Sequence, residues 1–262
     1  MSKVKALILR TAGTNCDCET QAAFEMCGAI AERVHINSLM ENKDRIFEYD
    51  ILALPGGFSY GDDIASGKIL ANEIKNKFGS QIKKFALSGR PIIGICNGFQ
   101  VLVKMGLLPD PELFEQVSTL SYNDSDKFEC RWVYLKTEKR KNNESSCLWT
   151  KNMPDVISLP VAHGEGKFIP VDSRLLAELD KNNQVVFRYS DEDGGIPEYP
   201  LAPNGSVEQI AGICNAGGNV FGLMPHPERY VFGLQHPAAK CFNSSGYGCG
   251  KVIFQNAVDF VK

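Results

Sequence analysis

Short apolar segments alternate with segments of helical spacing through the first 110 residues of the chain. Apolar runs typical of buried strands occupy residues 4–9, 29–36, 50–54 and 90–95. Between and after them, apolar side chains recur at helical intervals over residues 17–27, over residues 64–78 with an extension through 82–87, and over residues 99–105. This β-α-β-α order predicts an α/β fold with a doubly wound, mainly parallel sheet and helices on both faces.

The second half of the chain has a different pattern, in which strand-like runs dominate. Strands are predicted over residues 131–135, 156–159, 185–189 and 210–213, with a hairpin turn over residues 215–219. These strands predict a mixed or antiparallel extension of the sheet, and residues 251–261 predict a closing amphipathic helix. The polar segments 138–146 and 190–209 are predicted loops, and neither is long enough to be a domain linker. Residues 1–262 are therefore predicted to form a single domain.

Composition narrows the class of protein. Of the 262 residues, 44% are apolar and 23% are charged, which excludes a disordered or collagen-like chain. The 28 basic and 31 acidic side chains leave a net charge of −3, so nucleic acid is not expected as a partner. No apolar stretch is long enough for a signal-peptide core or a membrane span, which predicts a cytoplasmic chain with no membrane partner. Most of the nine cysteines should then be free, buried thiols.

One cysteine has the surroundings of a nucleophile. Cys96 follows a predicted buried strand, precedes a predicted helix, and lies between Gly94 and Gly98 in the spacing of a nucleophile elbow. The glycines are needed because strand and helix pack closely around a sharp, strained turn, and the start of the helix should favour a thiolate. The alternative is a structural cysteine at a strand end, with glycines in an ordinary turn.

A cysteine nucleophile needs a base, and the chain has four histidines. His226 lies between two prolines that should hold the backbone extended, so that His226 and Glu228 point to the same side and can form an imidazole–carboxylate pair. Glu228 would then orient His226 and leave its other ring nitrogen free to take the thiol proton. His35 has no acidic partner two residues later and His236 lies in a loop rich in proline and glycine, so both are interpreted as structural.

The glycine-rich turn after the predicted strand 50–54 is a third candidate element. Its backbone N–H groups could point at a ligand, as an oxyanion hole requires. A phosphate-binding loop is the competing interpretation, but Asp62 and Ile69 stand where the Walker motif needs a glycine and a hydroxyl side chain. The spacing of Cys16 and Cys18 is poor evidence for a metal site, and no metal is predicted.

Four motifs together resemble those of the class I, triad-type glutamine amidotransferases, in which a glutaminase domain releases ammonia from glutamine. The motifs are residues 56–62 (GGFSYGD), 94–100 (GICNGFQ), 162–166 (AHGEG) and 225–229 (PHPER). Within this class they are most similar to the glutaminase subunits of phosphoribosylformylglycinamidine (FGAM) synthase, an enzyme of purine biosynthesis, and residues 14–17 and 253–256 agree. The resemblance spans nearly the whole chain and implies the flavodoxin-like fold of the class.

The resemblance implies a role for each matching residue. Cys96 would attack the side-chain amide of glutamine to give a thioester, His226 would move protons, and Glu228 would orient His226. The backbone N–H groups of Gly57 and Asn97 would form the oxyanion hole. Four further residues match positions that bind the substrate's α-amino and α-carboxylate groups: Ser59, Gln100, Gly164 and Glu165. His163 would then be a neighbour of the site and not a second base.

The resemblance also implies what lies outside this chain. ATP, Mg²⁺ and formylglycinamide ribonucleotide (FGAR) would bind a separate large synthetase subunit, usually with a small third subunit, and ammonia would pass to it without entering bulk water. No cofactor is expected in this chain itself. The chain departs from the short bacterial members of this family in residues 63–67, so its surface for docking on the synthetase is expected to differ. It also has predicted insertions near 122–150 and 233–250.

Two other functions stay open. One is a catalytically weak, glutaminase-like scaffold subunit, which the intact Cys96, His226 and Glu228 disfavour. The other is a thiol hydrolase or chaperone of the DJ-1/PfpI type, which shares an elbow cysteine in a similar sheet. Those proteins lack the Pro-His-Pro-Glu segment at this position, so this function ranks behind glutamine hydrolysis.

Overall fold

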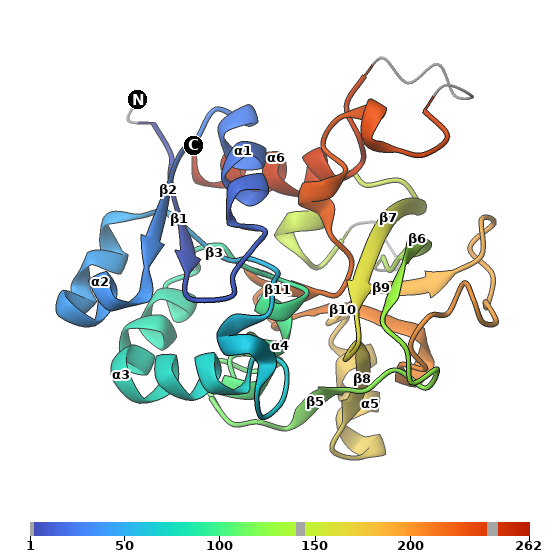
Figure 1. Ribbon diagram of the computed structural model, residues 1–262, viewed down its shortest axis with the longest axis horizontal. Helices are drawn as coiled ribbons and strands as arrows, with labels where there is room; N and C mark the ends of the chain where they lie inside the picture. The colour runs from blue at the N-terminus through green and yellow to red at the C-terminus, as the bar shows by residue number, and fades with distance from the viewer. Residues whose placement is uncertain (1–2, 140–144, 240–245) are drawn as a thin grey trace.

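A nine-stranded sheet in the order β2-β1-β3-β4-β11-β10-β9-β6-β7 forms the centre of the computed structural model, which describes residues 3–139, 145–239 and 246–262 (Figure 1). Its strands are β1 (Lys5–Arg10), β2 (Ile30–His35), β3 (Ile51–Leu54), β4 (Ile92–Ile95), β6 (Glu129–Thr137), β7 (Val156–His163), β9 (Val185–Ser190), β10 (Ile210–Cys214) and β11 (Val220–Leu223). The pairs from β2 to β11 are parallel and those from β11 to β7 are antiparallel. The predicted α/β class, with its antiparallel extension, is confirmed.

Helices cover both faces of the parallel half. The helices are α1 (Asp17–Met26), α2 (Ile36–Glu41), α3 (Lys68–Leu87), α4 (Asn97–Met105), α5 (Ser173–Lys181) and α6 (Gly250–Val261). Short 3-10 helices occupy Lys43–Glu48, Ser59–Asp62, Leu148–Thr150, Val207–Gln209, Pro227–Arg229 and Gly233–Gln235. Figure 1 shows α1 and α6 on one side of the sheet and α3 and α4 on the other. An edge-on contact of Phe24 with Phe254, 5.0 Å between ring centres, joins α1 to α6.

The order of the parallel strands places three loops together. All residues of β3, β4 and β11 are buried, as expected for strands between two helical layers. Their carboxyl ends meet at one edge, where the N–H of Cys96 donates to the carbonyl oxygen of Leu223 at 2.8 Å. Ligands of open α/β sheets bind at such an edge. The loops after β3, β4 and β11 contain the predicted oxyanion turn, nucleophile and base.

The fold differs from the sequence prediction in one helix boundary and in its smaller elements. Helix α3 begins at Lys68 and not at residue 64, because Gly67 has a left-handed φ of +73° and its N–H donates to the Asp62 carboxylate, which closes a turn. A second sheet of β5 (Ser118–Ser121) and β8 (Lys167–Pro170), and helix α5, were not predicted. Their strands are short, and α5 buries only Leu179, so the apolar pattern of each is weak.

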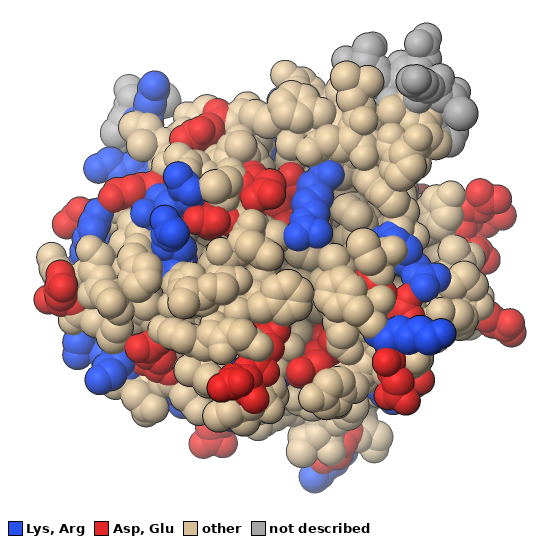
Figure 2. Space-filling view, viewed as in Figure 1, with Lys and Arg blue, Asp and Glu red and all other residues tan. Residues whose placement is uncertain are grey.

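The charges on the surface add little to the functional picture. On the face in Figure 2, acidic and basic side chains are interspersed among larger uncharged areas. Within the described residues, no helix combines the length and the apolar character needed to cross a bilayer. Parts of the predicted insertions near 122–150 and 233–250, namely residues 140–144 and 240–245, lie outside the described residues. The single-domain interpretation stays a prediction.

Candidate active site

Cys96 occupies a strained turn between β4 and α4. Its φ of +51° and ψ of −106° lie outside the regions that side-chain-bearing residues prefer. A Cβ atom on Gly94 would lie 2.6 Å from the carbonyl oxygen of Gly98, and one on Gly98 would lie 1.9 Å from the carbonyl oxygen of Leu54. Both glycines are therefore required by close packing of strand and helix, as the spacing predicted. The turn places the Cys96 side chain at the start of α4, where free N–H groups favour negative charge.

His226 and Glu228 form a buried pair in the loop after β11. Nδ1 of His226 lies 2.6 Å from Oε1 of Glu228, and each residue is 1% exposed. The predicted extended backbone is wrong, because residues Pro227–Arg229 form a 3-10 turn. The turn folds Glu228 back toward the imidazole, while the N–H of His226 donates to the carbonyl oxygen of Pro160 at 2.8 Å. The pair forms through this turn and not through alternation along a strand.

The other ring nitrogen of His226 is free for chemistry. Burial by itself would lower the pKa of His226, but the carboxylate of Glu228 and, after it, the neighbouring Cys96 raise it well above the usual value. Nε2 makes no hydrogen bond among the described residues. Thiol and imidazole are thus close enough to interact but are not yet bonded, as is common before a substrate binds. The Cys96 thiol instead donates to the carbonyl oxygen of Ala162 at 3.6 Å.

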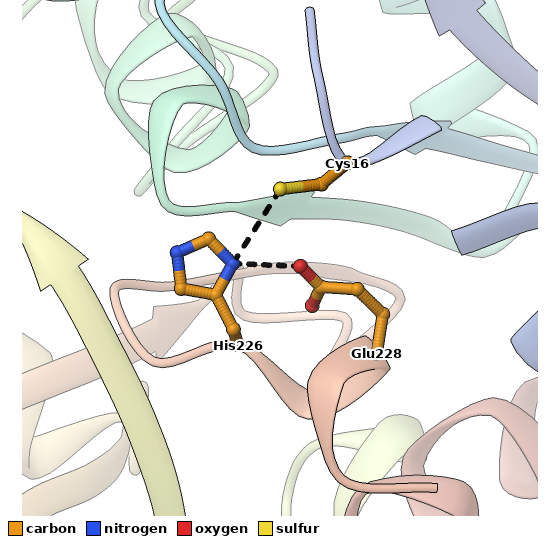
Figure 3. Close-up of side chains that lie close together, drawn as sticks. All are labelled: Cys16, His226 and Glu228. Atoms are coloured by element: carbon orange, nitrogen blue, oxygen red, sulfur yellow. Dashed lines mark hydrogen bonds and ion pairs between the residues drawn. The ribbon is translucent and has the colours of Figure 1, made fainter. Parts of the chain in front are cut away.

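A second thiol lies against the imidazole (Figure 3). Sγ of Cys16 is 4.0 Å from Nδ1 of His226, and the guanidinium of Arg229 donates to the same sulfur at 2.9 Å. One ligand atom from each of Cys16, His226 and Glu228 could meet a metal ion, since these atoms lie within 4.8 Å of one another. Arg229 would oppose a cation there, and a metal would take the Nδ1 atom that Glu228 now holds. The expectation of no metal stays a prediction.

The predicted oxyanion turn lies beside the start of α1. Gly57 has a φ of +148°, and a Cβ atom on it would lie 2.6 Å from the carbonyl oxygen of Gly13. The carbonyl oxygen of Gly56 accepts N–H groups from Asn15 and Cys16 at 3.3 and 3.1 Å, which fixes the turn. Neither the N–H of Gly57 nor that of Asn97 donates to an acceptor among the described residues. Both are available to an anion, and their role in catalysis stays a prediction.

The side chain of Asn97 ties this turn to α4. Its Oδ1 accepts the N–H of Ser59 at 3.2 Å, and its Nδ2 donates to Oδ1 of Asp62 and to Oε1 of Gln100, both at 3.0 Å. Nε2 of Gln100 in turn donates to the carbonyl oxygen of Glu165 at 2.6 Å. The structure therefore brings Ser59, Gln100 and Glu165 together, in contact with the nucleophile loop.

Glu165 belongs to a buried ion pair that the sequence interpretation missed. Its carboxylate lies 3.6 Å from Nζ of Lys104 and accepts the N–H of Ser66 at 3.2 Å. Burial, opposed by the charge of Glu165, lowers the pKa of Lys104. The side chain of Glu165 thus supports the loop after β3, while its carbonyl oxygen accepts from Gln100. Oγ of Ser59 is buried and has no partner among the described residues.

Several residues of the site gave little signal in the sequence. Cys16 reaches His226 from a distant part of the chain, and no local spacing links Cys16 to His226 or to Arg229, whose guanidinium contacts its sulfur. Lys104 lies in an apolar stretch of α4, where a lysine buried in a pair could have been suspected. Asn123 lies in a predicted insertion, and it contacts His163 at the end of β7 and Gly166 in the turn that follows.

Comparisons with known proteins agree with this geometry. A family model described as the CobB/CobQ-like glutamine amidotransferase domain matches residues 3–261. A protein of Dehalococcoides mccartyi named phosphoribosylformylglycinamidine synthase subunit PurQ is 49% identical over 263 residues, covering 100% of this chain and 99% of that protein. One of the same name from Archaeoglobus fulgidus is 44% identical, covering 99% of this chain and 98% of that protein. A chain in the structure of PurLQS from Thermotoga maritima has a TM-score of 0.75 at 34% identity, with 100% of both chains covered.

Proposed function

Because the chain belongs to the glutamine amidotransferases and, among them, to the PurQ family of FGAM synthase subunits, we propose that it hydrolyses glutamine and delivers the ammonia for conversion of FGAR to FGAM. Membership of this family confirms the resemblance drawn from the sequence motifs, and the chain is a glutamine amidotransferase component of an enzyme. The observation that best supports the proposed reaction is the strained Cys96 turn beside the buried pair of His226 and Glu228.

In the proposed reaction, the Cys96 sulfur attacks the carboxamide carbon of glutamine and its proton passes to Nε2 of His226. The carbon–nitrogen bond then breaks as this proton moves to the leaving nitrogen, so ammonia departs and a γ-glutamyl thioester remains. Water attacks the thioester and gives one proton to His226, which returns it to the sulfur as glutamate leaves. Glu228 holds Nδ1 throughout, so that Nε2 stays turned to the reacting atoms.

The negative oxygen of each tetrahedral intermediate is proposed to bind the N–H groups of Gly57 and Asn97. Both groups lack acceptors among the described residues, and one of them begins α4. Removing one such donor costs roughly 10²–10³ in kcat in other acyl-transfer enzymes. The side chain of Asn97 also bonds to the turn after β3, so it links the two loops that contain these donors.

Glutamine itself is proposed to bind across Ser59, Gln100 and the backbone of Gly164 and Glu165. The free hydroxyl of Ser59 is a donor suited to a carboxylate. The Gln100 amide is engaged at both ends by neighbouring groups, so it must exchange a partner when the substrate enters. No cofactor is proposed in this chain.

The partners are proposed to be a large synthetase subunit, which binds ATP, Mg²⁺ and FGAR, and a small third subunit. This rests on the similar Thermotoga maritima chain, whose structure is named for PurLQS. The ammonia would pass directly to the synthetase, and the complex would work in the cytoplasm.

The test is a coupled FGAM assay with the partner subunits, ATP and FGAR. Cys96→Ala should abolish the glutamine-dependent rate and leave the rate with free ammonia, which needs only the synthetase. Cys130→Ala, which removes an exposed thiol, is the matched control and should retain both rates. Glutamine-dependent turnover by Cys96→Ala would refute the assignment. Labelling of Cys96 by a glutamine-analogue electrophile would exclude the scaffold alternative, and hydrolysis of other acyl substrates without glutamine turnover would favour the thiol hydrolase.

A further inference from the structure

A second histidine is buried beside the candidate active site and has no part in the reaction above. His163 is the last residue of β7 and is 3% exposed. Its Nε2 atom has no hydrogen-bond partner among the described residues. A buried polar atom without a partner lowers stability, so a fold that retains one is a candidate for binding a ligand there.

Asn123 determines which nitrogen of His163 has the hydrogen. Nδ2 of Asn123 donates to the carbonyl oxygens of Lys127 and His163, both at 2.8 Å. Its Oδ1 must therefore be the acceptor, and it takes the N–H of Gly166 at 3.0 Å and lies 3.1 Å from Nδ1 of His163. Nδ1 is then the protonated nitrogen, and Nε2 is left with a free lone pair.

The ring of His163 is also held neutral and in place. Burial and, after it, the charge of His226 lower the pKa of His163 to about 3. The backbone N–H of His226 also donates to Pro160 of β7, three residues before His163, at 2.8 Å. Gly166 packs on the ring so closely that a Cβ atom there would lie 2.3 Å from Cε1 of His163. His163 is thus a fixed and neutral hydrogen-bond acceptor near neutral pH.

The end of β7 adjoins the nucleophile. The Cys96 thiol lies 3.6 Å from the carbonyl oxygen of Ala162, the residue before His163. A carboxamide carbon within reach of that sulfur brings its own NH₂ group to the same region. An amide NH₂ can donate a hydrogen bond to a lone pair, whereas the carboxylate of glutamate has only lone pairs to offer.

We propose that Nε2 of His163 accepts a hydrogen bond from the carboxamide NH₂ of glutamine and so selects the substrate against its product, glutamate. The selection is by exclusion as well as attraction, since a glutamate carboxylate would meet a lone pair that has no hydrogen to give. This inference rests on the proposed glutaminase function. Asn123 acts through His163 and is a positioning residue.

Three variants separate these roles in the complex with its synthetase partners. His163→Asn retains an amide nitrogen that can replace Nδ1 in the bond to Asn123, but it has nothing at the Nε2 position. Asn123→Asp leaves an acceptor at Nδ1 and adds a negative charge, which should protonate His163 and turn Nε2 into a donor. It also removes the two hydrogen bonds that Nδ2 of Asn123 donates, so its fold is checked by urea unfolding. His35→Asn is the matched control, because His35 is an exposed cap of α2 and asparagine caps helices well.

The measurements are KM for glutamine, kcat, and the inhibition constant of glutamate. In His163→Asn, KM for glutamine should rise about ten- to a hundredfold, with a smaller change in kcat. The inhibition constant of glutamate should not rise. In Asn123→Asp, glutamate should inhibit more strongly than in the wild type. His35→Asn should match the wild type.

A parallel loss of glutamine and glutamate binding in His163→Asn would overturn the proposal, because it would place His163 at a group that both molecules share. So would an unchanged KM. If His163→Asn does not fold, the glutamate inhibition of Asn123→Asp decides alone. A wild-type complex without glutamine-dependent turnover would refute the proposed function, whereas an active complex with unchanged selectivity would refute only the selection by His163.

Discussion

Acid should destabilise this protein through one buried imidazole. The folded state holds the pKa of His163 at about 3, while an unfolded chain has a histidine pKa of about 6.5. As the pH falls below 6.5, His163 binds a proton in the unfolded state but not in the folded state, so the free energy of unfolding must fall. The slope is about 1.4 kcal/mol per pH unit, and it continues until the pH approaches 3.

The loss attributable to His163 is therefore about 2 kcal/mol between pH 7 and pH 5. It can be isolated by comparing the wild type with His163→Asn, which has no group to titrate there. Urea unfolding of both proteins at pH 7 and pH 5 gives the free energy of unfolding of each. The wild type should lose about 2 kcal/mol more than the variant, whatever other groups contribute to both.

Equal losses in the two proteins would refute the argument, since they would mean that His163 is protonated in the folded state or exposed to water. His35→Asn controls for the removal of a histidine that is not buried and should behave as the wild type does. His226 has the opposite sign. Its pKa is raised in the folded state, so its contribution is complete below pH 6.5 and is lost as the pH rises through the folded pKa.

Three substitutions test the site further. Glu228→Gln should lower glutamine-dependent kcat by a factor of roughly 10²–10⁴ and shift the titration of His226 to lower pH. A pH–rate profile measures both effects, and an unchanged profile would contradict the pairing of His226 with Glu228. Gly98→Ala should lower the free energy of unfolding in urea by about 3 kcal/mol or more, because its Cβ atom would lie 1.9 Å from a carbonyl oxygen of β3. Wild-type stability would show that the turn around Cys96 can relax to make room for the methyl group. Gly166→Ala should displace the ring of His163 and raise KM for glutamine with little change in kcat; an unaltered KM would count against a fixed imidazole.

Local patterns determined the framework of the site. The alternation of apolar runs and helical spacings predicted the parallel half of the sheet, because burial between two helical layers requires continuous apolar strands. The spacing of Gly94, Cys96 and Gly98 predicted a strained turn, since only glycine fits where Cβ atoms would strike a carbonyl oxygen. Each of these patterns involves residues only a few positions apart in the chain. The local backbone conformation is enough to determine how such residues lie relative to one another.

Tertiary structure alone decided what surrounds the catalytic pair. Cys16 reaches His226 across 210 positions, and Asn123 reaches His163 across 40, because the order of strands in the sheet, and no local period, brings these segments together. The protonation of each histidine follows from this packing. A carboxylate beside one imidazole raises its pKa, and burial against an amide oxygen keeps the other neutral. The fold class, the nucleophile turn and the pairing of His226 with Glu228 could thus be predicted from residues close together in the chain, whereas the protonation of His163 and the contact of Cys16 with His226 depended on segments that only folding brings together.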